Sequence, residues 1–130
     1  MSESQESQES QDEANADSLH RLRDALRRFA HERDWERFHS PKNLASALIV
    51  EAGELLEPFQ WMGEDESRRL PEAERERVGE ELADVLLYLV RLADVLGIDL
   101  HAAALRKIEI NARKYPVELA RGNARKRGLP

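Results

Sequence analysis

The sequence predicts an all-α protein, a bundle of four main helices that associates into an oligomer. Apolar residues recur at spacings of three and four in four stretches, which is the pattern of amphipathic helices. The hydrophobic fraction is 41% and the aromatic fraction only 5%, so the expected core is aliphatic. A helical chain of 130 residues with 35% charged residues has little core for a monomer. We therefore expect a dimer or a dimer of dimers.

A disordered acidic tail is expected over residues 1–17, followed by the first helix at about residues 18–33. The tail repeats Ser, Gln and Glu with almost no apolar side chain, so burial cannot offset the entropy of ordering it. Ser18 is a candidate N-cap, and Leu22 and Phe29 belong to the apolar stripe. Without the tail, acids and bases balance, so the folded part has no charge bias toward nucleic acid.

Three further helices are expected, from residue 41, from residue 71 to about 96, and from about 99 to 114. Ser40 is a good N-cap and proline suits the first helical position, so the second helix begins at Pro41. Gly97 is expected to stop the third helix, and Pro116 the fourth. The helical domain therefore covers residues 18–116, and residues 117–130 form a basic C-terminal tail.

Two carboxylate pairs share one spacing, Glu51 with Glu54 and Glu81 with Asp84. Acids three residues apart lie on one side of a helix, and both pairs adjoin an apolar stripe. If the second and third helices face each other, four carboxylates are available to a hard cation such as Mg²⁺. Such ions activate a water that attacks phosphorus. The alternative is that all four acids are surface charges at helix edges, but the repetition of the pair favours a metal site.

Several other classes of protein are excluded by the composition. The chain has no cysteine, so disulfides, thiolate metal sites and a cysteine nucleophile are absent. Neither a Walker loop nor a glycine-rich dinucleotide turn is present. The longest apolar stretch, residues 82–100, is interrupted by charges and predicts an amphipathic helix rather than a membrane span. The N-terminus is polar and unlike a signal peptide, so we expect a cytoplasmic protein.

With these carboxylates in place, the chain resembles the all-alpha nucleoside triphosphate pyrophosphatases, the MazG-like superfamily, and within it the dCTP pyrophosphatase branch. The similarity covers about residues 20–116. The matching segments are Glu32-Arg33-Asp34-Trp35-Glu36, Phe38-His39, Pro41-x-Asn43-Leu44, Glu51-x-Gly53-Glu54, Phe59-Gln60-Trp61, Glu80-Glu81-Leu82-x-Asp84, Tyr88-Leu89 and Ile110-Asn111-x-Arg113-x-Tyr115-Pro116.

The resemblance implies an enzyme that cuts a nucleoside triphosphate between the α- and β-phosphates, giving the monophosphate and pyrophosphate. It implies Mg²⁺ held by Glu51, Glu54, Glu81 and Asp84, with Glu54 orienting or deprotonating the attacking water. The expected substrate is dCTP or a modified dCTP, and the expected purpose is sanitation of the nucleotide pool.

The same resemblance implies a set of substrate contacts. Aromatic faces and a histidine are expected to recognise the base, while positions on the second and fourth helices contact the rest of the nucleotide. Without the resemblance, the two tryptophans would be interpreted as core or interface anchors. Cations near the end of the fourth helix would be interpreted as charges that interact favourably with its dipole. The implied contacts are Trp35, His39, Asn43, Trp61, Tyr88, Asn111 and Lys114.

One departure from the branch concerns base selectivity. The dCTP branch often has a substrate-touching histidine nine residues before the position of Trp35, where this chain has Leu26. A dUTP-specific or broad MazG-type pyrophosphohydrolase therefore stays an alternative. A non-catalytic helical interaction module is the rival from another class, and it predicts no effect of Mg²⁺ on thermal stability.

The partners expected are a small-molecule nucleoside triphosphate and further copies of this chain, as a homodimer or homotetramer. No nucleic acid polymer and no membrane are expected. In such an oligomer, neighbouring protomers would complete each pocket, and the segment from Trp35 to His39 is a candidate for donation across an interface.

Overall fold

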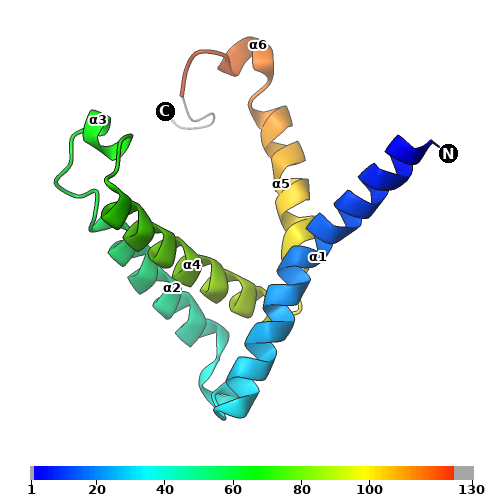
Figure 1. Cartoon of the computed structure of the whole chain (residues 1–130), viewed down its shortest axis with the longest axis vertical. Coiled ribbons are helices and arrows are strands. Elements are labelled where there is room, and N and C mark those ends of the chain that lie inside the picture. The colour runs from blue at the N-terminus through cyan, green and yellow to red at the C-terminus, as the bar shows by residue number, and fades with distance from the viewer. Residues whose placement is uncertain (1, 125–130) are drawn as a thin grey trace. The chain divides into compact units, whose positions relative to one another are not determined.

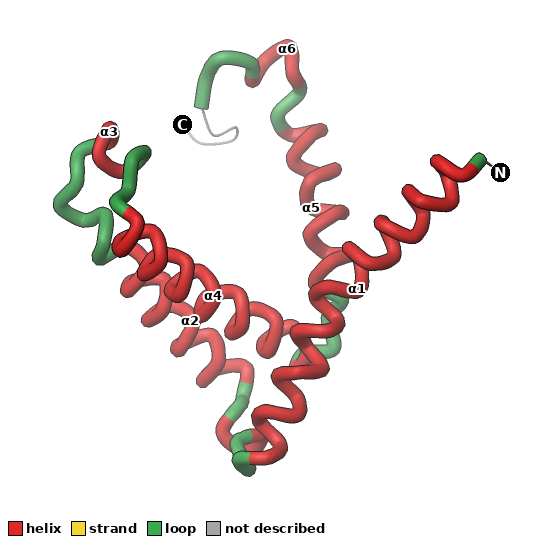
Figure 2. The backbone as a smooth tube through the Cα atoms, in the orientation of Figure 1, coloured by secondary structure: helices red, strands yellow, loops and turns green. Residues whose placement is uncertain are grey.

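The computed structural model describes residues 2–124, with the side chains of residues 8–17 outside that description. All regular structure in the described part is helical, as Figure 2 shows, so the all-α prediction is confirmed. The chain divides into two compact units, Met1–Ile98 and Asp99–Pro130. Each unit is described separately below.

The first unit contains three long helices. The helix α4 runs back along α2 and also packs against α1 (Figure 1). Where they meet, a small aliphatic core is buried, made of Ala30, Leu44, Val78, Val90 and Ala93. The elements of this unit are α1 (Glu3–Glu32), the 3₁₀ turn η1 (Glu36–Phe38), α2 (Pro41–Leu56), the short α3 (Glu64–Ser67) and α4 (Glu72–Val95).

The signals read from the sequence account for the ends of α2 and α4. The hydroxyl of Ser40 accepts a hydrogen bond from the backbone N–H of Asn43 at 3.2 Å, which caps α2 directly before Pro41. Pro71 precedes α4, and Gly97 follows it with a φ of +68°. That left-handed conformation costs glycine little, so the chain turns sharply after α4.

The start of the first helix was predicted wrongly. The helix α1 begins at Glu3 rather than near Ser18, and it passes residue 17 without a break. Locally, the side chain of Gln5 accepts a hydrogen bond from the backbone N–H of Ser2 at 3.2 Å, and Glu and Gln are good helix formers. Backbone propensity thus extends the helix into a stretch without an apolar stripe. That residues 1–17 form an acidic tail outside the domain stays a prediction.

The second unit contains α5 (Leu100–Lys114) and the short α6 (Val117–Ala120). The carboxylate of Asp99 accepts from the N–H of Ala102 at 3.0 Å, which confirms the expected cap of this helix. The helix α6 falls within the range predicted as a basic tail, and residues 125–130 lie outside the described part. No helix among the described residues is both long and apolar enough to cross a membrane.

Candidate functional site

The two carboxylate pairs face each other from α2 and α4. One carboxylate oxygen each of Glu51, Glu81 and Asp84 lies within 4.8 Å of the others. Glu54 is not part of this group of three, but it forms a side-chain hydrogen bond with Glu51. The packing of α4 along α2 therefore brings all four predicted acids to one place. We call these four residues the carboxylate cluster.

The acids of the carboxylate cluster disfavour each other's ionisation, and two of them have raised pKa values. Burial, the hydrogen bond with Glu54 and the charges of the neighbouring acids raise the pKa of Glu51. Burial and the charges of Glu54 and Asp84 raise the pKa of Glu81. The Oε2 atoms of Glu51 and Glu81 are shielded from solvent, and neither has a hydrogen-bond partner among the described residues.

The carboxylate cluster fits a hard divalent cation. Its donors are oxygens, which Mg²⁺ and related ions prefer, and two of these oxygens are shielded and unpaired. A cation would satisfy these atoms and offset the repulsion that raises both pKa values. Glu51, Glu81 and Asp84 are the residues that could hold one ion together.

A pocket of about 420 Å³ adjoins the cluster, between α1, η1, α2 and α4. Asp84 belongs both to the cluster and to the wall of this pocket. The predicted base-recognition residues Trp35, His39 and Tyr88 line it, and so does Leu26. We call this cavity the aromatic pocket; its other lining residues are Leu22, Ala25, Phe29, Ala30, Leu44, Leu87 and Arg91.

The aromatic pocket is shaped by contacts around Trp35. The ring of Trp35 meets that of Phe29 edge-on at 5.7 Å between centroids, and that of His39 at 6.5 Å. Trp35 is still 44% exposed, so it is not a core anchor within this chain. An indole with this much exposed surface suits stacking against a planar base.

Two predicted substrate residues of the first unit lie apart from this wall. Asn43 donates its side-chain N–H to the backbone oxygen of Phe38 at 3.0 Å, so it holds the turn that carries His39. Trp61 follows α2, is 89% exposed and is not among the residues that line the aromatic pocket. A contact of either residue with substrate stays a prediction.

The remaining predicted substrate residues, Asn111 and Lys114, lie on α5 in the second unit. The backbone oxygen of Asn111 accepts from the N–H of Tyr115 at 2.8 Å. The ammonium of Lys114 lies 5.6 Å from the centroid of the Tyr115 ring. Their role at the site stays a prediction.

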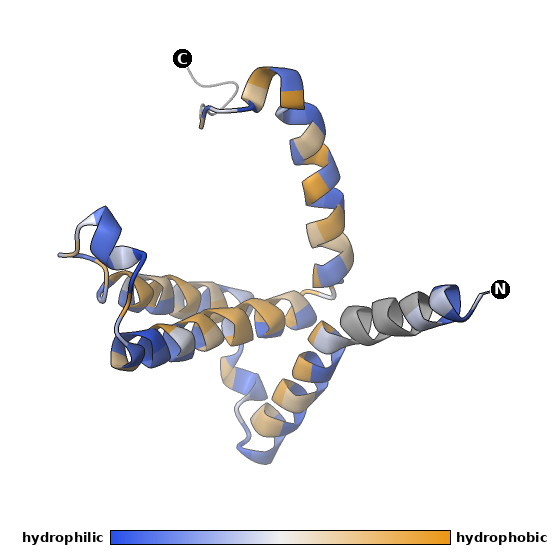
Figure 3. Cartoon of the chain, turned by 45° about the horizontal axis from the view of Figure 1, so that its top comes forward, coloured by the Kyte–Doolittle hydropathy of each residue, from blue (hydrophilic) through white to orange (hydrophobic). Residues whose placement is uncertain are grey.

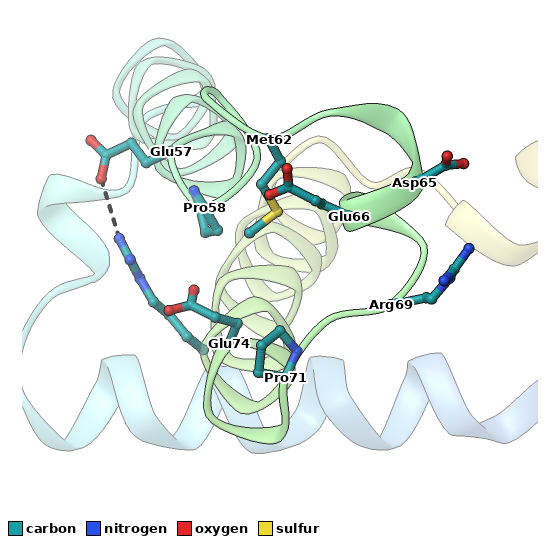
Figure 4. Close-up of a pocket in the computed structure, with 9 residues that line it drawn as sticks. Glu57, Pro58, Met62, Asp65, Glu66, Arg69, Pro71 and Glu74 are labelled. Carbon is teal, nitrogen blue, oxygen red and sulfur yellow. Dashed lines mark ion pairs between the residues drawn. The ribbon is translucent and has the colours of Figure 1, made fainter.

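A second cavity, of about 580 Å³, lies where α2 ends and α4 begins, beside α3 (Figure 4). Figure 4 shows the ion pair between Glu57 and Arg77, whose charged atoms are 3.6 Å apart. The charge of Arg77 lowers the pKa of Glu81, against the larger effects that raise it. The wall of this cavity mixes acids with arginines and includes none of the four acids of the carboxylate cluster.

The sequence reasoning missed one polar residue of the aromatic pocket, Arg91. Its Nε–H donates to Nδ1 of His39 at 3.1 Å. A signal for it was present, since Asp84, Tyr88 and Arg91 follow one another at spacings of four and three, on one face of α4. The partner of Arg91 could not be identified in the same way, because His39 is 52 residues away in the chain.

Comparison with known proteins agrees with this geometry. The model of the MazG-like family matches residues 47–128. This chain belongs to the MazG-like family. Among its curated relatives, the dCTP pyrophosphatase 1 of Homo sapiens is 52% identical over 100 residues, which are 75% of this chain and 59% of that protein. The dCTP pyrophosphatase 1 of Bos taurus is 51% identical over 98 residues, covering 74% of this chain and 58% of that protein.

A solved relative has the same fold. The crystal structure of a pyrophosphatase from Archaeoglobus fulgidus aligns with a TM-score of 0.71 at 46% identity, over 75% of this chain and 92% of that one. The resemblance to the MazG-like superfamily and its dCTP pyrophosphatase branch is thus confirmed. The chain spans about three-fifths of the length of the curated relatives that it matches.

Proposed function

We propose that this chain is a Mg²⁺-dependent nucleoside triphosphate pyrophosphatase that converts dCTP or a modified dCTP into the monophosphate and pyrophosphate, as a step in sanitation of the nucleotide pool. The observation that carries the proposal is that Asp84 belongs both to a group of three carboxylates whose oxygens lie within 4.8 Å of one another and to the aromatic pocket. A base and a metal-bound phosphate chain can then be held side by side. The relatives named dCTP pyrophosphatase 1 support the same substrate.

The residues of the carboxylate cluster have two different proposed roles. A bound Mg²⁺ supplies positive charge that neutralises phosphate oxygens and makes water more acidic. Glu51, Glu81 and Asp84 hold the ion, whereas Glu54 lies outside this group of three and is the proposed general base. Its carboxylate accepts a proton from the attacking water as the water oxygen bonds to phosphorus. The bond between phosphorus and the bridging α–β oxygen breaks, and pyrophosphate leaves.

The aromatic pocket selects the nucleotide. Trp35 and Tyr88 offer ring faces for stacking on the base, and each such contact contributes about 1–3 kcal/mol. His39 supplies a polar group in an otherwise mostly apolar wall, so it orients the base by a hydrogen bond. The contacts proposed to complete the site are Asn43, Trp61, Asn111 and Lys114.

A second candidate keeps the reaction and widens the substrate range to dUTP or to nucleoside triphosphates in general. The observation that favours it is the position of Leu26, which lines the aromatic pocket where the dCTP branch often has a histidine. An aliphatic side chain cannot discriminate between bases by hydrogen bonding, so selectivity would depend on stacking and on His39.

We further propose that the chain works as a homodimer or homotetramer. Apolar side chains of α2 and α4 remain exposed, with Ile49 72%, Leu56 60% and Leu82 53% exposed. Figure 3 shows the hydrophobic residues that run along both helices. Ile49 and Leu56 are seven residues apart, and so are Leu82 and Leu89, which is the spacing of a helix-packing seam. Light scattering coupled to size-exclusion chromatography measures the mass directly; a monomer at all concentrations contradicts this assembly.

A pyrophosphate-release panel tests the reaction and the substrate together. Canonical and modified deoxynucleoside triphosphates are incubated with Mg²⁺ or with a chelator, and the products are separated. We expect pyrophosphate and dCMP from dCTP, only with the metal, and loss of turnover in Glu54→Gln but not in Glu80→Gln. Release of orthophosphate alone, or no release from any nucleotide, shows that the reaction class is wrong.

A further inference from the structure

The wall of the aromatic pocket contains a guanidinium that the proposed reaction does not use. Arg91 lies on α4 with its side chain only 11% exposed. Its Nε–H donates to Nδ1 of His39 at 3.1 Å, and its Nη1 donates to Asp94 at 3.4 Å. The guanidinium of Arg91 therefore lies between two partners, His39 and Asp94.

Arg91 is fixed through Asp94, whose side chain is only 9% exposed. The same carboxylate accepts a hydrogen bond from Nε of Arg27 on α1 at 2.7 Å. The hydrogen bond and charge of Arg27 lower the pKa of Asp94, which therefore stays ionised. A continuous polar chain thus runs from α1 through α4 to the turn that carries His39.

The chemistry of the arginine decides which nitrogen of the histidine carries hydrogen. A guanidinium has five N–H donors, no acceptor, and stays protonated in proteins. In the contact with Arg91, Nδ1 of His39 must therefore be the acceptor, so a neutral ring carries its hydrogen on Nε2. Burial, followed by the charge of Arg91, lowers the pKa of His39 against the opposing charge of Glu36, which favours this neutral ring.

We propose that Arg91 is a positioning residue that locks His39 in the tautomer with hydrogen on Nε2, so that His39 acts as a donor toward an acceptor atom of the base. His39 and Arg91 both line the aromatic pocket, together with Trp35 and Tyr88. The pocket is then preset to receive a carbonyl oxygen or an unprotonated ring nitrogen. The role toward a base rests on the proposed function, whereas the tautomer does not.

Nitrogen-15 NMR of the ring nitrogens tests the tautomer in the unaltered protein without any nucleotide. The chain has four histidines, and the signals of His39 are assigned by their absence in His39→Gln. We expect one protonated nitrogen at pH 7.5, Nε2, and a mixture of tautomers in Arg91→Met. A wild-type ring with hydrogen on Nδ1, or with freely exchanging tautomers, overturns the proposal.

Kinetic measurements test whether the fixed tautomer of His39 contributes to binding of the base. In Arg91→Met we expect KM for dCTP to rise about five- to tenfold, the effect of one lost hydrogen bond, with kcat changed less than about twofold. In a His39→Ala background the same substitution should have no further effect on KM, because its partner is gone. Arg75→Met, an exposed arginine earlier on α4, is the matched control.

Additive effects of the two substitutions, or equal losses in Arg91→Met and Arg75→Met, refute a role through His39. If Arg91→Met does not fold, the wild-type NMR measurement and Arg91→Lys decide the question, since lysine keeps the charge but cannot span both partners. The NMR result also separates this proposal from the reaction. A locked Nε2–H tautomer in a protein that hydrolyses no nucleotide contradicts the proposed function and leaves the positioning by Arg91 intact.

Discussion

The first prediction concerns the cation site and the substitution Glu81→Gln. The substitution keeps the size of the side chain and removes one of three carboxylates whose oxygens lie within 4.8 Å of one another. The neighbouring Glu80 is exposed and outside this group, so Glu80→Gln is a control with the same chemical change one residue away. Only the first substitution should alter the response to a divalent cation.

The magnitude follows from mass action. A ligand at 100 times its dissociation constant stabilises the folded state by about 2.7 kcal/mol, which raises Tm by about 10 °C for a domain of this size. Loss of one anionic ligand weakens binding, and a 100-fold loss leaves a rise of only about 2 °C at the same Mg²⁺ concentration. Without metal, Glu81→Gln should melt higher than wild type, because it removes the charge repulsion and the cost of shielding an unpaired charge from solvent.

Differential scanning calorimetry with Mg²⁺, with Mn²⁺ and with a chelator measures all of these changes. We expect a large rise in Tm for wild type and for Glu80→Gln, and a small one for Glu81→Gln. The reasoning is refuted if saturating cation leaves the wild-type Tm unchanged, or if Glu81→Gln responds as strongly as Glu80→Gln.

Three further outcomes follow from the site. Trp35→Ala should raise KM for dCTP about tenfold through lost stacking, and it should lower Tm as well, since the 44% exposed side chain also contacts the rings of Phe29 and His39; an unchanged KM would instead assign Trp35 to packing alone. Leu26→His should shift the ratio of kcat/KM for dCTP over dUTP by about tenfold, measured by pyrophosphate release. An unchanged ratio means that Leu26 does not affect base selectivity. The raised pKa of Glu81 means that the folded state holds its proton more tightly than the unfolded state, so stability falls as pH rises through that pKa. Metal-free wild type should therefore lose Tm relative to Glu81→Gln as pH rises above about 4.5, and parallel profiles contradict the raised pKa.

How far the sequence predicts this site depends on the range of each interaction. Glu51, Glu54, Glu81 and Asp84 could be placed from helical periodicity, because the apolar stripes decide which faces of α2 and α4 meet. The ends of α2 and α4 were also predictable, since caps and prolines act within one turn. The start of α1 was predicted wrongly for a related reason. Between Ser2 and Ser18 the helix depends on backbone propensity alone, and no apolar stripe in the sequence indicates it.

Interactions between distant segments could not be predicted from the sequence. The bond from Arg91 to His39 joins residues 52 positions apart, and the pair of Arg27 with Asp94 joins residues 67 positions apart. Nothing in the local pattern assigns one of the many arginines to a particular carboxylate or ring. The first contact joins α4 to the residue that follows η1, and the second joins α4 to α1, so both depend on how the whole unit packs.

The helix α4 explains why the carboxylate cluster and the aromatic pocket adjoin each other. Glu81, Asp84, Tyr88 and Arg91 lie within about 80° of one another around its axis and within about 15 Å along it. Asp84 lies in the middle, with the carboxylate cluster on one side and the aromatic pocket on the other. Because a helix is stiff, the separation between these two parts is fixed by its rise and not by loop motion. In the proposed function, a nucleotide would lie along this one helix, with its phosphates at the carboxylate cluster and its base in the aromatic pocket.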